Sequence, residues 1–564
     1  MEYMKSLGYK TILLITCMLW SVSCNDFLKE DPKGQLMTDA AFSQPSDLDG
    51  AVSVVYRQAS RATFGLTQFI NSQMGDDLST HMASNKAMIR EWDNYNISTN
   101  NDRLFWCWQD KFLVIKAANN VISGAESTVG ATQEQIDYAL GQAHFWRAWA
   151  YFYLVRAFGP LPKITSLEID FNAKLSTVSE IFDLIVEDLE IAEKLPVGYN
   201  TVPQAMNGVN VVANRGAAQA VLSYVYLTMA GWPLNKGTEY YSKAAAKALE
   251  VIDGADNGTY YYQLYDEYWK IHSKQENKQN KESIMSVYYS RAFGTGDDSE
   301  AARGAINDLL SCSQGWTDTR AEIGFWVKFP DGPRKDATYP PFTYNDGDKG
   351  MYRWWSTSLP EGDRTPFFGK SAYANDNNSA GSYEYDFSKG YGSQGDGWSD
   401  QCHQLVRLAE VYLFYAEAVG RSGQTNARAI SLLNKVRNRA DGHGPVDDPS
   451  FNRYPAGMSA TDLAEAAYNE HGWEIAGWYW GAIAPRYNDM QRMDRVKDHF
   501  ATRAADPEYV FKDPDTGEDV RVHEMFGATG TWSQSKMYAP YPATEVERNP
   551  ILNISTEDKL NLIY

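Results

Sequence analysis

The sequence predicts a mostly α-helical protein: a scaffold of degenerate tetratricopeptide-like helical repeats, with a large loop-rich insertion that carries short strands. Three observations support this fold class. Apolar residues recur at helical spacing in many segments, and several of these segments follow one another as pairs with short connections. Residues 260–404 lack this spacing and are rich in Gly, Asp, Asn and aromatic residues. Such composition is typical of loops and small hairpins.

Length and charge limit the classes of function. The chain has 564 residues, of which 43% are hydrophobic and 22% charged, so it can bury one large core or two intergrown cores. A formal net charge of −20 repels nucleic acid and anionic surfaces, and we expect no nucleic-acid partner. The 17 Trp and 36 Tyr residues exceed what a core requires and leave aromatics for exposed platforms. The five Cys residues show no zinc-binding spacing.

The first 23 residues are predicted to be a lipoprotein signal peptide. Lys5 and Lys10 precede an apolar run, residues 11–20, which is too short to span a membrane as a helix. Ser23 is a small residue directly before Cys24, as a lipoprotein signal peptidase requires. Cys24 is therefore the predicted lipidation site, and the chain would contact the membrane through that anchor. The alternative is an ordinary secretory leader with an incidental cysteine.

The helical pattern begins at residues 47–59 and returns at 106–122. A central helix on which the rest of the chain is organised follows. Its apolar spacing starts at Ile136, and it ends at Gly159, before Pro160 and Pro162. Because it is apolar on nearly every face, we expect other helices to pack around it. The later predicted helices are 176–195, with Ser176 as a possible cap, and the pairs 215–230 with 240–252 and 405–420 with 426–440.

Two regions lack helical spacing. Residues 74–101 are polar and predict a long loop, and long loops in compact proteins are often functional. Within the insertion, residues 283–289 predict a strand, and the tail after Pro507 is loop-rich. We therefore divide the mature chain into a helical region 24–259, the insertion 260–404 and a C-terminal region 405–564.

Several motifs resemble one protein family. The run Ala-Tyr-Phe-Tyr-Leu-Val-Arg-x-Phe-Gly at 150–159, the helices at 407–418 and 432–440, and Pro-x-x-Glu-x-x-x-Asn-Pro at 542–550 resemble the SusD/RagB family of nutrient-binding surface lipoproteins. Residues 469–474 depart from the family pattern. The resemblance implies an outer-membrane, lipid-anchored protein at the cell surface. It would bind an oligo- or polysaccharide without cleaving it and deliver it to a SusC-like TonB-dependent transporter.

Candidate ligand contacts follow from the chemistry of sugars. A sugar ring presents a C–H face that lies well on an aromatic ring, and its hydroxyls need groups that donate and accept hydrogen bonds. Aromatic residues beside Asn, Asp or Arg in predicted loops meet both needs. The candidates are Asp77, Arg90, Trp92, Asn94, Tyr95, Asn101, Trp316, Trp354, Trp355 and Trp398. For the adjacent pair Trp354 and Trp355, we expect one ring to point inward and the other outward.

Catalysis is not expected. Asp76 and Asp77 are the most suggestive acid pair, but adjacent acids in a loop seldom face each other across a bond, as a glycosidase requires. No cofactor or metal motif occurs. A structural Ca²⁺ at the Asp-rich turn 513–519 is possible, although a solvated turn fits the spacing better. Three alternatives stay open: a RagB-like peptide-binding import lipoprotein, an all-helical glycosidase, and a structural repeat adaptor without a ligand.

Overall fold

The computed structural model describes most of the chain from Phe42 onward. The described residues are 42–63, 71–168, 170–197, 211–272, 276, 280–289, 305–306, 319–345, 347–348, 350–370, 398–399, 401–477 and 482–564. The predicted signal peptide, Cys24 and Trp316 lie outside them. Trp398 is described only as backbone, in β9 (Trp398–Ser399). In the described part of the chain, no helix is both long and apolar enough to cross a bilayer.

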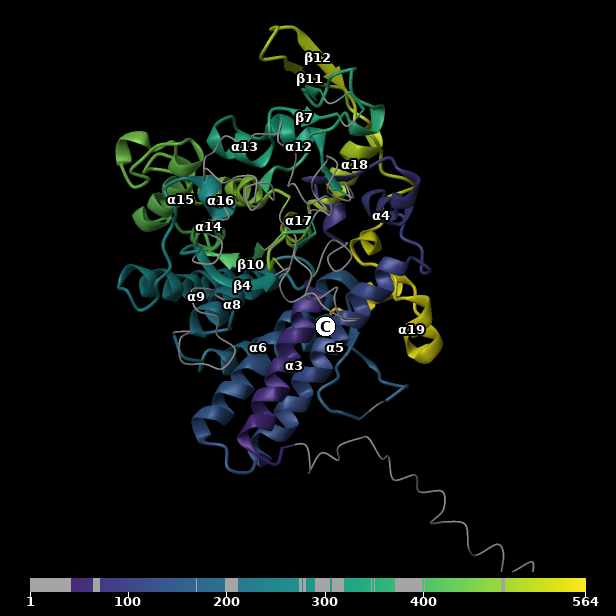
Figure 1. Ribbon diagram of the computed structural model, residues 1–564, viewed down its shortest axis with the longest axis vertical. Helices are drawn as coiled ribbons and strands as arrows, with labels where there is room; N and C mark the ends of the chain where they lie inside the picture. Colours follow the sequence, from purple (N-terminus) through teal and green to yellow (C-terminus); the bar gives the residue numbers. More distant parts are fainter. Residues whose placement is uncertain are drawn as a thin grey trace, which may run out of the picture.

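Three long helices form a bundle at the lower end of the molecule (Figure 1): α3 (Pro45–Ala62), α5 (Asp102–Gly124) and α6 (Gln133–Phe158). Helix α6 is the predicted central helix, and nearly all of its residues from Ile136 onward are buried. Thr132 and Gln135 form a capping box at its start. Gly159 ends it with a φ of +79°, a conformation that favours glycine.

The predicted helix pairs are present. They are α8 (Arg215–Ala230) with α9 (Thr238–Asp256), and α14 (Leu408–Arg421) with α15 (Ala427–Ala440). The single helix predicted at 176–195 is α7 (Val178–Ala192). The mostly helical fold class is thereby confirmed, whereas the tetratricopeptide-like character of the repeats stays a prediction. Thr177, and not Ser176, caps α7, because its side chain accepts from the Glu180 amide. Residues 405–407 belong to a strand rather than to α14.

Three C-terminal helices lie where the sequence analysis predicts none: α16 (Ala460–Ile475), α17 (Arg486–Arg492) and α18 (Val496–Ala505). Every residue of α17 is buried, although most of them are polar or charged. Arg492, for example, donates to both carboxylate oxygens of Glu417 on α14, at 2.8 and 2.6 Å. Gly420 lets α14 and α16 pack backbone to backbone, since a Cβ there would lie 2.6 Å from the Ala460 carbonyl oxygen.

Short antiparallel strand pairs hold the insertion to the rest of the chain. Strand β4 (Ser283–Tyr289) is the predicted strand, and it pairs with β10 (Gln401–Arg407), which crosses the predicted boundary at residue 404. Strand β1 (Leu78–Thr80) pairs with β6 (Thr319–Ala321), with Leu78 opposite Ala321. The segment 74–101 was predicted as a loop, but it also contains helix α4 (Ala87–Asp93).

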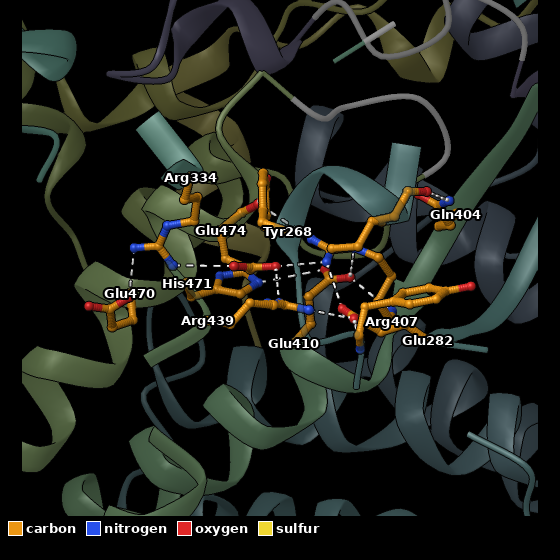
Figure 2. A network of polar contacts seen from close by, with 12 residues as sticks. Tyr268, Glu282, Arg334, Gln404, Arg407, Glu410, Arg439, Glu470, His471 and Glu474 are labelled. Carbon is orange, nitrogen blue, oxygen red and sulfur yellow. Dashed lines mark hydrogen bonds and ion pairs between the residues drawn. The ribbon is translucent and has the colours of Figure 1, made fainter. Parts of the chain in front are cut away.

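A buried ion-pair network fastens the insertion to the helical scaffold (Figure 2). The Glu474 carboxylate on α16 accepts from Arg407 at 2.8 Å and from Arg439 at 2.7 Å, and it pairs with Arg334 at 3.2 Å. Arg334 lies on α13 (Pro333–Thr338), within the insertion. Burial alone would raise the pKa of Glu474, but the three arginines more than offset it and hold the pKa far below its usual range. Glu474 is therefore charged and joins three elements.

Candidate ligand-binding surface

Four aromatic side chains from distant segments pack against one another, and two of these segments, α12 and β11, lie in the upper part of the molecule (Figure 1). They are Trp326 of α12 (Ile323–Lys328), Trp354, Trp355, and Phe511 of β11 (Tyr509–Lys512); we call them the aromatic cluster. The Trp326 ring centroid lies 5.2 Å from that of Trp354 and 4.9 Å from that of Phe511. The Trp355 and Phe511 centroids are 5.1 Å apart. These spacings are typical of favourable aromatic pairs.

One of the two adjacent tryptophans is buried and the other is partly exposed, as the sequence predicts. Trp354 is 2% exposed, whereas Trp355 and Trp326 are only partly buried. The indole N–H of Trp355 donates to Asp513 Oδ2 at 2.9 Å, which sets the orientation of its ring. Trp326 and Trp355 are therefore the partly exposed rings of the cluster, and Trp354 is its buried ring; Nζ of Lys335 lies 4.4 Å from the Trp326 ring centroid.

Two acids of the 513–519 turn bind side chains in or beside the aromatic cluster. The turn joins β11 to β12 (Asp519–Val522). Asp515 makes a bidentate ion pair with Arg353, with both N–O distances at 2.8 Å, and Asp513 Oδ1 accepts from the Asp515 amide. Their carboxylates thus position Arg353 and Trp355. Among the described residues, no three His, Cys, Asp or Glu side chains are grouped so as to hold a metal ion.

Most of the predicted ligand-binding residues in segment 74–101 lie in the interior of the protein. Trp92 and Tyr95 are buried, and the Tyr95 hydroxyl donates to the Met74 carbonyl at 2.6 Å. Asn101 is buried as the N-cap of α5, where it accepts from the Arg103 amide. In the described conformation these three side chains are structural and offer no surface to a ligand, because the segment folds back against the helices instead of extending as a loop.

The other three predicted contacts of this segment also bind within the protein. Asp77 is buried and accepts from the Gly477 amide at 2.8 Å, and burial raises the pKa of its carboxyl to about 7. Arg90 is half-buried and donates to the carbonyls of His81 and Ala83. The backbone carbonyl of Asn94 accepts from the backbone amide of Thr529. Of the six predicted residues in this segment, Arg90 and Asn94 keep partial exposure.

The segment and the insertion nevertheless meet, as the site hypothesis requires. Besides the β1–β6 pairing, the His81 imidazole lies 3.3 Å from Asp363, which also pairs with Arg320 of β6. The backbone amide of Glu322 donates to the Asp77 carbonyl at 3.3 Å. These contacts place the edge of segment 74–101 directly beside α12.

A cavity of about 240 Å³ is bordered by α12 and by Asp76 of segment 74–101. We call it the polar cavity; it is lined by Asp76, Glu322, Gly324, Phe325, Lys328, Tyr468, Asn469, Arg486, Met490, Arg495, Asp498, His499, Thr502 and Tyr509. Sequence analysis singled out only Asp76 of this set, and for its pairing with Asp77. The remaining residues lie on or next to five separate elements, α12, α16, α17, α18 and β11, with no shared motif.

Burial and ion pairing set the charges in the polar cavity. Burial would raise the pKa of Asp76, but a bidentate pair with Arg486, at 2.7 and 2.9 Å, brings it below its usual value. Burial lowers the pKa of His499 to about 3 and raises that of Glu322 well above its usual range. At neutral pH, the His499 imidazole is therefore uncharged, and the Glu322 carboxyl lies 3.3 Å from Nη1 of Arg503.

Comparison with known proteins places this architecture in a defined class of surface binding proteins. A family model described as "Starch-binding associating with outer membrane" matches residues 26–227, and the SusD family model matches residues 339–555. A SusD-like protein of Bacteroides ovatus is 25% identical, over 98% of both chains. The chain belongs to the SusD/RagB family.

Solved structures share the fold. A SusD homolog from Bacteroides thetaiotaomicron superposes with a TM-score of 0.70 at 18% identity, over 92% of this chain and 97% of that one. Surface glycan-binding protein A from the same organism, solved in complex with laminarihexaose, superposes with a TM-score of 0.65 at 16% identity, over 91% and 99%.

Proposed function

We propose that this protein is a cell-surface lipoprotein that captures an oligo- or polysaccharide and delivers it to a SusC-like TonB-dependent transporter in the outer membrane. Family membership supports the outer-membrane location, since one matching family is described by that association. Lipidation at Cys24 would supply the anchor. Binding, rather than cleavage, is the proposed activity.

The aromatic cluster is the observation that carries this proposal. Partly exposed indole rings are suited to the C–H faces of sugar rings, and here two of them stand side by side on a rigid base. Arg353 lies over Phe342 and pairs with Asp515, so donors and acceptors border the rings. A protein of the same fold is solved with a bound glucan hexamer, which supports a glycan as the ligand class.

The arrangement in space also suits a tethered receptor. Helix α3 begins at the lower end of the molecule in Figure 1, whereas α12 and the β11–β12 hairpin lie at the upper end. An anchor that precedes α3 would therefore attach near the lower end of the molecule. The aromatic cluster would lie at the opposite end. This separation favours capture of a ligand from outside the cell.

A glycan array tests the proposal. Purified protein without its signal peptide is incubated with neutral and uronate-containing oligosaccharides and with peptides, and the supernatants are assayed for new reducing ends. We expect binding to a subset of oligosaccharides with no new reducing ends. Binding to peptides alone would favour the RagB-like alternative, new reducing ends would show a glycosidase, and no binding at all would favour a structural adaptor.

A matched pair of variants locates the surface. Trp355→Ala removes a partly exposed ring of the aromatic cluster, and Phe171→Ala removes a ring that is 61% exposed in a different part of the fold. We expect Trp355→Ala to abolish the array signal and Phe171→Ala to keep it. The reverse result would move the site away from the cluster.

A further inference from the structure

We propose that the polar cavity binds one uncharged sugar residue, at the end or at a branch of a glycan whose neighbouring residues lie on the aromatic cluster. This inference rests on the proposed function and adds to it a substrate class, namely glycans recognised by a neutral terminal or branch residue.

The size of the cavity limits its occupant. Its volume of about 240 Å³ is below the range of roughly 300–1,000 Å³ that is usual for drug-sized ligands. A single small ring fits this space, whereas a run of sugar residues does not. Phe325 and Tyr509 supply aromatic faces in its lining. Gly324 permits this packing, because a Cβ there would lie 2.5 Å from the Tyr509 hydroxyl.

The charges of the lining are already balanced. Arg486 is ion-paired with Asp76, and its Nη1 has no hydrogen-bond partner among the described residues. Nη2 of Arg495 donates to both carboxylate oxygens of Glu465, at 2.8 and 2.7 Å, and Glu322 pairs with Arg503 at 3.3 Å. The two remaining charged residues of the lining, Lys328 and Asp498, have opposite signs and are exposed to water. A buried carboxylate or ammonium of a ligand would find no unpaired counter-charge, and burying an unpaired charge is costly.

The polar groups have the mixed character that sugar hydroxyls require. The uncharged His499 imidazole and the Asn469 amide can each donate and accept a hydrogen bond, and the Glu322 carboxyl can accept one. The hydroxyl of Tyr468 is buried and has no hydrogen-bond partner among the described residues. A buried hydroxyl without a partner is unfavourable, and a ligand hydroxyl would supply the missing bond.

The polar cavity and the aromatic cluster share their walls. On α12, Phe325 and Lys328 line the cavity, whereas Trp326 belongs to the cluster. On β11, Tyr509 lines the cavity and Phe511, two residues later, packs in the cluster. Two residues along a strand span about 6.8 Å, and their side chains lie on the same face. The residues of a glycan that follow the one in the polar cavity would therefore contact the aromatic cluster.

Two bulky substitutions on α18 test the proposal. Thr502 is exposed and lines the cavity, whereas its neighbour Ala501 is exposed and does not line it. Thr502→Trp would fill the opening, and Ala501→Trp is the matched control. On an array of neutral and uronate-terminated oligosaccharides, we expect Thr502→Trp to weaken binding of the neutral probes about tenfold and Ala501→Trp to leave it unchanged.

Tyr468→Phe gives a second, independent readout. If the hydroxyl has only a structural role, its removal is neutral or stabilising, because it has no partner to lose. If it binds sugar, the affinity for the same neutral probes falls several-fold while the melting temperature holds or rises. Full affinity in both Thr502→Trp and Tyr468→Phe, or a preference of the wild type for uronate-terminated probes, would overturn the inference. Failure of the wild type to bind any oligosaccharide would instead overturn the proposed function itself.

Discussion

The indole rings of Trp354 and Trp355 are perpendicular, with an interplanar angle of 89° and centroids 5.2 Å apart. In this geometry the two adjacent residues lie in different environments. Trp354 faces the interior, where it packs against Trp326 and Phe511. Trp355 forms the outer layer, and its N–H is held by Asp513.

Substitution of these two residues should therefore separate stability from binding. Trp354→Ala leaves a cavity beneath the cluster and should lower the free energy of unfolding by about 3–5 kcal/mol. Trp355→Ala removes a partly exposed ring and should cost clearly less. Denaturant unfolding of both variants measures the difference. An equal loss of stability in the two variants would contradict the division between an inner and an outer ring.

The Glu474 network predicts a large stability effect far from the ligand surface. Glu474→Gln removes the negative charge that Arg334, Arg407 and Arg439 share, and it should destabilise the protein by about 3–5 kcal/mol. Glu239→Gln is the control, because Glu239 pairs with Lys243 on the surface of α9, and such pairs contribute little. Thermal unfolding compares the two. Similar melting temperatures would show that the network does not fasten the insertion.

The buried histidine His471 predicts a pH dependence in the alkaline range. Burial would lower its pKa, but the neighbouring Asp489 and Glu410 more than offset this and raise the pKa to about 9. A raised pKa means that the stabilisation is fully present below the unfolded value of about 6.5 and is lost as the pH rises through 9.

The measurement is the unfolding free energy of the wild type and of His471→Gln between pH 6 and pH 10. The advantage of the wild type should shrink over this interval by an amount on the order of 3 kcal/mol. A difference that does not change with pH would show that His471 is neutral in the folded protein.

Membrane attachment is tested at Cys24. Cys24→Ser removes the thiol that would carry the lipid, so the protein should move from the outer-membrane fraction to the soluble fraction of cells that express it. Fractionation followed by immunodetection, with Cys107→Ser as a control at a buried thiol, distinguishes the two cases. Retention of the Cys24→Ser protein in the membrane fraction would contradict lipidation at this residue.

Apolar periodicity was sufficient to find the long helices of the fold. It predicted α3, α5, α6 and α14, because each of these buries a face of apolar side chains. The same signal is missing from α17, whose buried residues include Arg486, Asp489 and Arg492, which pair with acids or bases from elsewhere in the chain. Buried charges leave no hydrophobic pattern, so such helices cannot be recognised from spacing.

The candidate site shows a similar limit. The Trp354–Trp355 pair was visible in the sequence because two adjacent aromatics in a polar loop are unusual. Burial of Tyr95 was not visible, since its partners His499 and Trp532 come from a distant segment of the chain. The polar cavity has no sequence signal at all, because it exists only where α12, α16, α17, α18 and β11 meet.

The central claim is that the aromatic cluster holds a glycan, and calorimetric titration tests it most directly. Wild-type protein and Trp355→Ala are each titrated, at a temperature where both are folded, with the neutral oligosaccharide that gives the strongest array signal. We predict saturable binding to the wild type and an affinity at least about tenfold lower for Trp355→Ala. Equal affinities in the two proteins would contradict the claim.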